Sequence, residues 1–169
     1  MTKPYQTLIL FVISVFFLSL VYTAQSEQGH FEIRGQVYCD PCRAHFVTKL
    51  STFLKGATVR LECRNREQDT NLTLKGEEAT TDNTGTYHIS VDGDYEDDIC
   101  EVKLVKSPDP DCSEISVEKY FKDAARISLA ANSGMATDAR MANPLGFLKK
   151  VANPECEKLL ADMGIHSNN

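Results

Sequence analysis

The sequence predicts an all-β protein: an antiparallel β-barrel or sandwich of about seven strands, with one short C-terminal helix and three disulfides. Several short segments alternate apolar and polar residues and are separated by turn residues, a pattern typical of barrels and sandwiches. All six cysteines follow the first apolar run, and an even number of cysteines in a secreted domain indicates disulfides. Clear helical spacing of apolar residues occurs only near the end of the chain.

Residues 1–26 are interpreted as a secretory signal peptide. A basic start precedes an apolar run from Leu8 to Val21, which is shorter than the roughly 20 apolar residues that a membrane-spanning helix needs. Small residues at Ala24 and Ser26 predict cleavage after Ser26, which leaves a mature domain of residues 27–169. An uncleaved membrane anchor is the alternative interpretation.

The mature domain is acidic, because losing Lys3 with the leader changes the formal charge from −6 to about −7. Nucleic acids and anionic membranes attract basic surfaces, so neither is expected as a partner. No second long apolar segment occurs in the sequence, and the mature form is therefore not expected to enter a membrane.

Period-two alternation predicts the strands, because successive side chains of a strand face opposite sides of the sheet. In the first strand, apolar residues from Phe31 to Cys39 share one face, and Pro41 ends the strand because proline cannot donate to a ladder. The expected strands cover residues 31–39, 57–64, 72–79, 86–91, 100–106, 125–131 and 144–148. Segments 46–54 and 132–143 are interpreted as connections, the first of them a loop that could include one helical turn.

The same alternation places two cysteines in the core. Cys63 lies on the apolar face of the second expected strand, and Cys100 lies on the apolar face of the fifth. A disulfide between Cys63 and Cys100 is therefore the natural choice. The order of the other pairs is left open by the pattern. These pairs would join Cys39 and Cys42 to Cys112 and Cys156.

The last expected element is a short helix. Apolar residues from Cys156 to Met163, including Leu159 and Leu160, recur at spacings of three and four and form one helical face. Pro154 suits the first helical position after a cap at Asn153, and Gly164 can end the helix. We expect the helix to dock on the domain through Cys156 and its leucines.

The segment Cys39-Asp40-Pro41-Cys42 has the spacing of a redox dithiol, and it could also supply half of a zinc site. A redox pair works when a helix N-terminus lowers the pKa of its first thiol, but here a strand precedes the pair. Zinc would need a second ligand pair, and the four histidines are scattered through the chain. Structural disulfides are favoured over both chemistries, and no metal or cofactor is expected.

One loop is strongly acidic, with five carboxylates in seven residues: Asp92, Asp94, Glu96, Asp97 and Asp98. Clustered carboxylates can bind calcium, but the EF-hand pattern fails because glycine is missing at its sixth position and glutamate at its twelfth. A solvated loop between two strands is favoured. Such a loop is the candidate surface for binding a partner with a basic face.

Other residues carry weaker signals. Asn71-Leu72-Thr73 is a glycosylation sequon, which we expect to be used in a secreted protein. Arg43 is interpreted as solvated, with partner binding as the alternative. Tyr38 should face outward, either packed under the preceding loop, which is favoured, or exposed as an interface anchor. The sequence contains no G-x-S-x-G elbow and no visible Ser-His-acid cluster, so an enzyme is not expected.

The stretch from Gly35 to Arg43, Gly-Gln-Val-Tyr-Cys-Asp-Pro-Cys-Arg, resembles the signature of the Ole e I family, the group of the major olive pollen allergen. The similarity extends over the mature chain and includes Gly56–Val59, Cys112–Glu114, Asn143–Phe147 and six cysteines in the family's order. Segments 97–101 and 104–108 are especially similar to the goosefoot (chenopod) member. Arg34 departs from the signature, which usually has Glu, Gln or Thr at this outward-facing position.

The resemblance implies a secreted plant protein of pollen or reproductive tissue, with a compact β-barrel or sandwich. It implies the disulfides Cys39–Cys112, Cys42–Cys156 and Cys63–Cys100. Family members are not known as enzymes, and many are allergens. Their proposed role is in pollen hydration and pollen-tube growth, including binding to the outer domain of a receptor kinase. We therefore expect an extracellular binding or signalling protein whose partner is a receptor kinase or another cell-surface protein. A structural wall component and a wall-acting enzyme are the alternatives.

Overall fold

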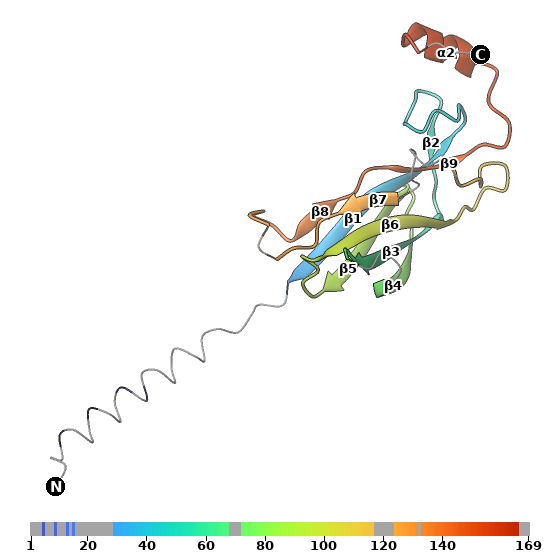
Figure 1. Ribbon diagram of the computed structural model, residues 1–169. Helices are drawn as coiled ribbons and strands as arrows, with labels where there is room; N and C mark the ends of the chain where they lie inside the picture. The colour runs from blue at the N-terminus through green and yellow to red at the C-terminus, as the bar shows by residue number, and fades with distance from the viewer. Residues whose placement is uncertain are drawn as a thin grey trace.

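The computed structural model describes residues 29–67, 72–116, 124–131 and 133–165, together with the isolated positions 5, 9, 13 and 15. These residues form two sheets packed face to face, with a short helix beyond one end (Figure 1). One sheet contains β1 (His30–Asp40), β2 (Thr52–Phe53), β5 (Thr86–Asp92), β8 (Ala139–Met141) and β9 (Leu145–Leu148). The other contains β3 (Thr58–Asn65), β4 (Leu72–Thr80), β6 (Asp98–Lys106) and β7 (Ala124–Ile127).

The first sheet is organised around β1. One long edge of β1 pairs antiparallel with β5 from His30 to Gln36. Tyr38 and Cys39 pair with the two residues of β2. The opposite edge of β1 pairs with β8 and then β9, and both of these short strands run parallel to it. The Cys39-x-x-Cys42 motif therefore begins where the most heavily paired strand ends.

The second sheet has the order β4-β3-β6-β7, and all of its pairs are antiparallel. Apolar residues of its inner face meet those of the first sheet in one core, as period-two alternation requires. The largest fully buried side chains of this core include Tyr87, Phe31, Phe147, Ile33, Leu61 and Leu129. Cys63 and Cys100 face each other in register on β3 and β6 and form a disulfide.

The predicted all-β sandwich with one C-terminal helix and three disulfides is confirmed. Neither sheet closes on itself, so the architecture is a sandwich and the term barrel applies only loosely. Two strands were not expected, because β2 lies in the predicted loop 46–54 and β8 lies in the predicted connection 132–143. With two and three residues, respectively, these strands are too short to show any periodicity.

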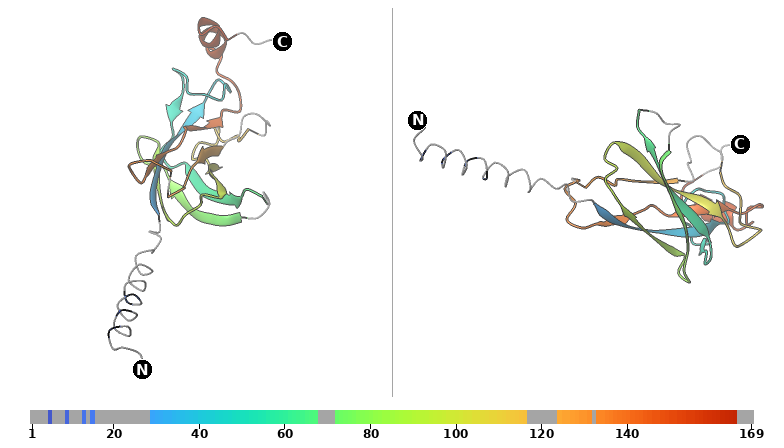
Figure 2. Two further views of the ribbon diagram at one scale, coloured as in Figure 1. Left: turned by 60° about the vertical axis from the view of Figure 1, so that its left-hand side comes forward. Right: turned by 90° about the horizontal axis from the view of Figure 1, so that it is seen from below.

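Helix α2 (Cys156–Asp162) begins two residues later than predicted, with Glu155 instead of Asn153 as its N-cap, and it ends before Gly164 as predicted. The side-chain oxygen of Asn153 accepts a hydrogen bond from the backbone N–H of Glu155, and Gly164 ends the helix with a φ of +76°. The expected docking holds for Cys156, which is bonded to Cys42, but the leucines contribute less than expected, because Leu159 and Leu160 are only partly buried and Met163 is 51% exposed. Cys156 is the only buried residue of α2, and the helix stands off the end of the sandwich (Figure 2).

The expected leader and its cleavage site after Ser26 lie outside the described residues, apart from the four isolated positions. Asn71 of the sequon also lies outside them. In the described parts of the chain, no helix is long and apolar enough to cross a membrane.

Candidate binding surfaces at the two ends of the sandwich

The turn after β1 is built around Asp40, which is completely buried. One oxygen of its carboxylate accepts the backbone N–H of Cys42 at 3.0 Å, and the other accepts that of His45 at 2.7 Å. Arg43 and His45 have φ angles of +54° and +62°, a region that residues other than glycine seldom adopt. Hydrogen bonds from backbone N–H groups to the buried carboxylate thus hold a strained turn, and this gives a physical reason for aspartate within the motif.

Arg43 joins three segments of this end. Its guanidinium donates two hydrogen bonds to the carboxylate of Glu114, at 2.7 and 2.8 Å, and a third to the carbonyl of Lys149 at 2.8 Å. The hydrogen bond from Arg43 lowers the pKa of Glu114 below its ordinary value. Arg43 is therefore engaged within the chain, and the interpretation of it as a solvated residue is wrong. The Cys39–Cys112 disulfide, a pairing that only the family resemblance implied, brings Arg43 and Glu114 close together.

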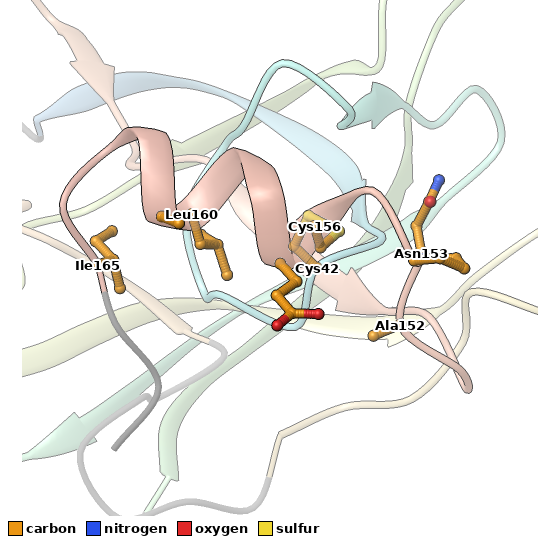
Figure 3. Close-up of a pocket in the computed structure, with 9 residues that line it drawn as sticks. Cys42, Ala152, Asn153, Cys156, Leu160 and Ile165 are labelled. Carbon is orange, nitrogen blue, oxygen red and sulfur yellow. A yellow bond between two sulfur atoms is a disulfide. The ribbon is translucent and has the colours of Figure 1, made fainter. Parts of the chain in front are cut away.

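Two disulfides complete this cysteine-anchored end. They are Cys39–Cys112 and Cys42–Cys156, the same pairs that the resemblance implies. The second holds α2 above a hollow of about 540 Å³, which the side chains of Leu160 and Ile165 line beside the disulfide (Figure 3). No described group of three or more histidine, cysteine, aspartate or glutamate side chains is arranged to hold a metal ion.

Tyr38 is buried, with 3% of its surface exposed. Its ring lies against Gly146, its cross-strand partner on β9, where an added Cβ would come within 2.6 Å of the ring. The tyrosine faces outward as predicted from alternation, but it packs on a glycine instead of forming an exposed anchor. The favoured interpretation, in which Tyr38 packs within the fold, agrees with its burial. Its ring packs on β9, however, and not under the preceding loop as expected.

The acidic loop, defined as residues 92–98, lies at the opposite end of the sandwich, where β5 ends and β6 begins. Its five carboxylates do not converge. Asp92 contacts the His30 ring nitrogen Nδ1 at 2.6 Å, and Asp98 accepts the hydroxyl of Thr73 at 2.6 Å. Asp94 accepts the backbone N–H groups of Glu96 and Ala131. The loop thus has local hydrogen bonds that fix its shape.

The remaining charge of the acidic loop faces solvent. Asp94, Glu96 and Asp97 are exposed, and none of them forms an ion pair with a described residue. The loop backbone is held from both sides, since Arg66 donates its N–H to the carbonyl of Asp97 and Tyr95 donates its N–H to the carbonyl of Leu129. A rigid loop that displays uncompensated carboxylates suits a partner with a basic surface.

His30 is the residue of this end that sequence reasoning did not single out. Its two ring nitrogens lie 2.6 Å from Asp92 and 3.1 Å from Glu32, and Glu32 also accepts the hydroxyl of Ser90. The hydrogen bond with Asp92, followed by that with Glu32, raises the pKa of His30 above its ordinary value. The serine hydroxyl contacts the glutamate, so these four side chains do not form the Ser–His–acid chain of a nucleophilic site.

Comparisons with known proteins agree with this fold. The family model described as "Pollen protein Ole e 1 like" matches residues 29–164. An "Olee1-like protein" of Betula pendula is 55% identical over 150 residues, which cover 89% of each chain. "Pollen allergen Che a 1" of Chenopodium album is 47% identical over 161 residues, which cover 95% of each chain.

A solved structure shows the same architecture. The crystal structure of the major plantain pollen allergen Pla l 1 matches this chain with a TM-score of 0.66 and 33% sequence identity. The match covers 75% of this chain and 99% of the plantain chain. Together with the family model and the relatives, this likeness identifies the chain as a member of the Ole e 1-like family of pollen proteins.

Proposed function

We propose that this chain is a secreted, non-enzymatic pollen protein that binds a cell-surface partner in pollen hydration or pollen-tube growth. The partner is the extracellular domain of a receptor kinase or a similar cell-surface protein. The observation that carries the proposal is the acidic loop, where Asp94, Glu96 and Asp97 are exposed on a rigid scaffold. Family membership supports a role in pollen, and the family model and a relative of this chain are named for a pollen protein and a pollen allergen.

Secretion is supported by the three disulfides, which form and persist in oxidising compartments, and by the leader pattern of residues 1–26. The protein purified from the medium of plant cells should begin at Glu27, as read by N-terminal sequencing. Removal of N-glycans should lower its mass, and Asn71→Gln should abolish that change. A product that keeps residues 1–26 would contradict secretion by cleavage after Ser26.

Binding through the acidic loop can be tested with two matched double variants. Asp94→Lys with Asp97→Lys reverses two charges in the loop, while Asp111→Lys with Asp162→Lys makes the same change at the cysteine-anchored end. The probe is a panel of purified extracellular domains of pollen receptor kinases, with affinity measured by surface plasmon resonance.

Wild-type protein should bind at least one domain, and binding should weaken as salt screens the charges. The loop variant should lose at least tenfold in affinity, whereas the variant at the other end should stay within twofold. Equal binding by both variants would assign the interface to another surface. Binding to none of the domains would contradict the receptor-kinase class.

A further inference from the structure

One side of the sandwich is open between the edges of β4 and β5, which lie side by side (Figure 1). A groove of about 470 Å³ runs between them, with Leu61 and Ile89 at its base. Four apolar side chains pack against the core but remain partly exposed: Leu74, Ala79, Val91 and Tyr95. All four line this groove. The apolar side chains that pack against the described core but stay partly exposed are therefore gathered in this groove.

The edge of β5 presents backbone hydrogen-bonding groups to this groove. In the ladder with β1, Gly93 donates its N–H to the carbonyl of Gly29, and Gly85 accepts the N–H of Val37. Residues of β5 with odd numbers therefore bond to β1, because antiparallel ladders alternate. The N–H and C=O groups of His88 and Ser90 point the other way. No described strand pairs with this outer edge, and β4 pairs only with β3.

The two ends of the groove differ in charge. Asp92 and Tyr95 line one end, and both belong to the acidic loop. Glu78 of β4 lines the groove as well, although Arg60 partly neutralises it at 2.7 Å. Beyond Asp92 lie the exposed carboxylates of Asp94, Glu96 and Asp97. The groove therefore runs from a neutral end into the acidic loop.

We infer that this groove binds an extended peptide segment of the partner, which adds to the edge of β5 as a further strand. Its backbone would pair with that of His88 and Ser90, and alternate apolar side chains would cover Leu74, Ala79 and Val91. Lysine or arginine residues at one end of the segment would face the acidic loop. Addition of a strand to a free sheet edge uses backbone hydrogen bonds for affinity and side-chain pockets for specificity. This inference rests on the proposed function and names the form in which the partner binds.

Two substitutions at one position isolate the backbone contribution. His88→Pro removes the outward N–H but no hydrogen bond to β1, and proline is tolerated on such strand edges. His88→Ala removes the same side chain and keeps the N–H, so it is the matched control. A second pair does not alter the backbone: Ala79→Phe fills the groove, while Thr80→Phe places the same ring at an exposed position. Circular dichroism and disulfide mapping establish that each variant is folded.

The probe is a phage-displayed library of random twelve-residue peptides selected on the His88→Ala protein. Enriched peptides should alternate apolar and polar residues and carry lysine or arginine at one end. Their affinity should fall at least tenfold for His88→Pro and for Ala79→Phe, and stay within twofold for Thr80→Phe. Bound peptide should slow amide exchange at His88 and Ser90 at least tenfold. The absence of enriched peptides, or peptides that bind His88→Pro and Ala79→Phe as tightly as the His88→Ala protein, would overturn the inference.

The same variants separate this inference from the proposed function. A receptor domain that binds wild type and both groove variants equally, but not the acidic-loop variant, would sustain the proposed function and overturn the groove. Peptides that depend on the groove would sustain the groove even if no receptor domain binds.

Discussion

At the scale of single residues, Asp40 is the side chain that holds the turn after β1. It is buried, and both of its oxygens accept backbone N–H groups of the turn that carries Cys42. We expect Asp40→Asn to destabilise the protein by about 1–3 kcal/mol, because the amide nitrogen would face a backbone donor and leave it unsatisfied. Urea denaturation should show this loss, while Asp111→Asn, at an exposed position, should change little. Equal stability of the two variants would contradict the assigned role of Asp40.

The second prediction for a single residue concerns pH. The pKa of His30 is raised by its hydrogen bonds with Asp92 and Glu32, so folding favours the protonated ring. Its contribution to stability is fully present below the unfolded pKa of about 6.5 and is lost as pH rises through the higher folded pKa. Other ionisable groups near this cluster are His88 on β5 and Asp138 before β8.

An NMR titration of the histidine rings measures this effect directly. His30 should titrate above 6.5, and Asp92→Asn should lower its midpoint. The wild-type protein should also lose more stability between pH 6 and pH 9 than the Asp92→Asn variant does. A His30 midpoint at or below 6.5 would show that Asp92 and Glu32 do not stabilise the protonated ring of His30.

At the scale of elements, α2 depends on a disulfide more than on packing. It has seven residues, of which only Cys156 is buried, and isolated helices of this length are not stable in water. We expect the double variant Cys42→Ser with Cys156→Ser to release the helix and to cost about 2–5 kcal/mol in stability. Amide exchange in α2 should become as fast as in an unfolded peptide, while the core strand β3 stays protected.

A control for this element is Met163→Ser, which removes an exposed apolar side chain beside the intact disulfide. Its helix should keep the protection seen in wild type. If α2 remains protected without the Cys42–Cys156 bond, then Leu160 and the walls of the hollow supply more docking energy than their partial burial indicates.

At the scale of the whole molecule, local alternation predicted most of the fold because each long strand has one buried face. Phe31 to Cys39 and the strand around Cys63 show this pattern without knowledge of their partners. What could not be predicted depends on contacts between distant segments. The Arg43–Glu114 pair spans 71 residues, and the burial of Tyr38 depends on a glycine that β9 brings beside it. Helical spacing in α2 indicated an apolar face but not what covers that face.

The groove between β4 and β5 is another feature that could not be predicted, because it depends on contacts between distant segments. The sequence pattern identified β4 and β5 as strands but could not show that both are sheet edges lying side by side. On the opposite side of the sandwich, the gap between the two sheets is bridged by Arg140, in a segment that was expected to be a polar connection. The two sides of the molecule therefore differ in how completely they are closed.

Arg140 belongs to β8 of the first sheet, and it donates a hydrogen bond at 3.1 Å to the carbonyl of Ser128, which follows β7 of the second sheet. It also donates to carbonyls of its own segment, and its guanidinium lies 4.8 Å from the centre of the Phe31 ring. With 4% of its surface exposed, it acts as a clasp between the sheets. We expect Arg140→Met to keep the volume but lose charged hydrogen bonds worth about 1.5–3 kcal/mol each before relaxation.

The measurement that checks this clasp combines urea denaturation with amide exchange. Arg140→Met should lower the free energy of unfolding by more than 1 kcal/mol, and exchange should accelerate first in β7 and β8 because their side of the sandwich opens. Arg34→Met is the matched control, since Arg34 is exposed on β1 and its replacement should stay within about 0.5 kcal/mol. A stability loss in Arg140→Met that spreads evenly over both sheets, or no loss at all, would show that the apolar core alone joins the sheets.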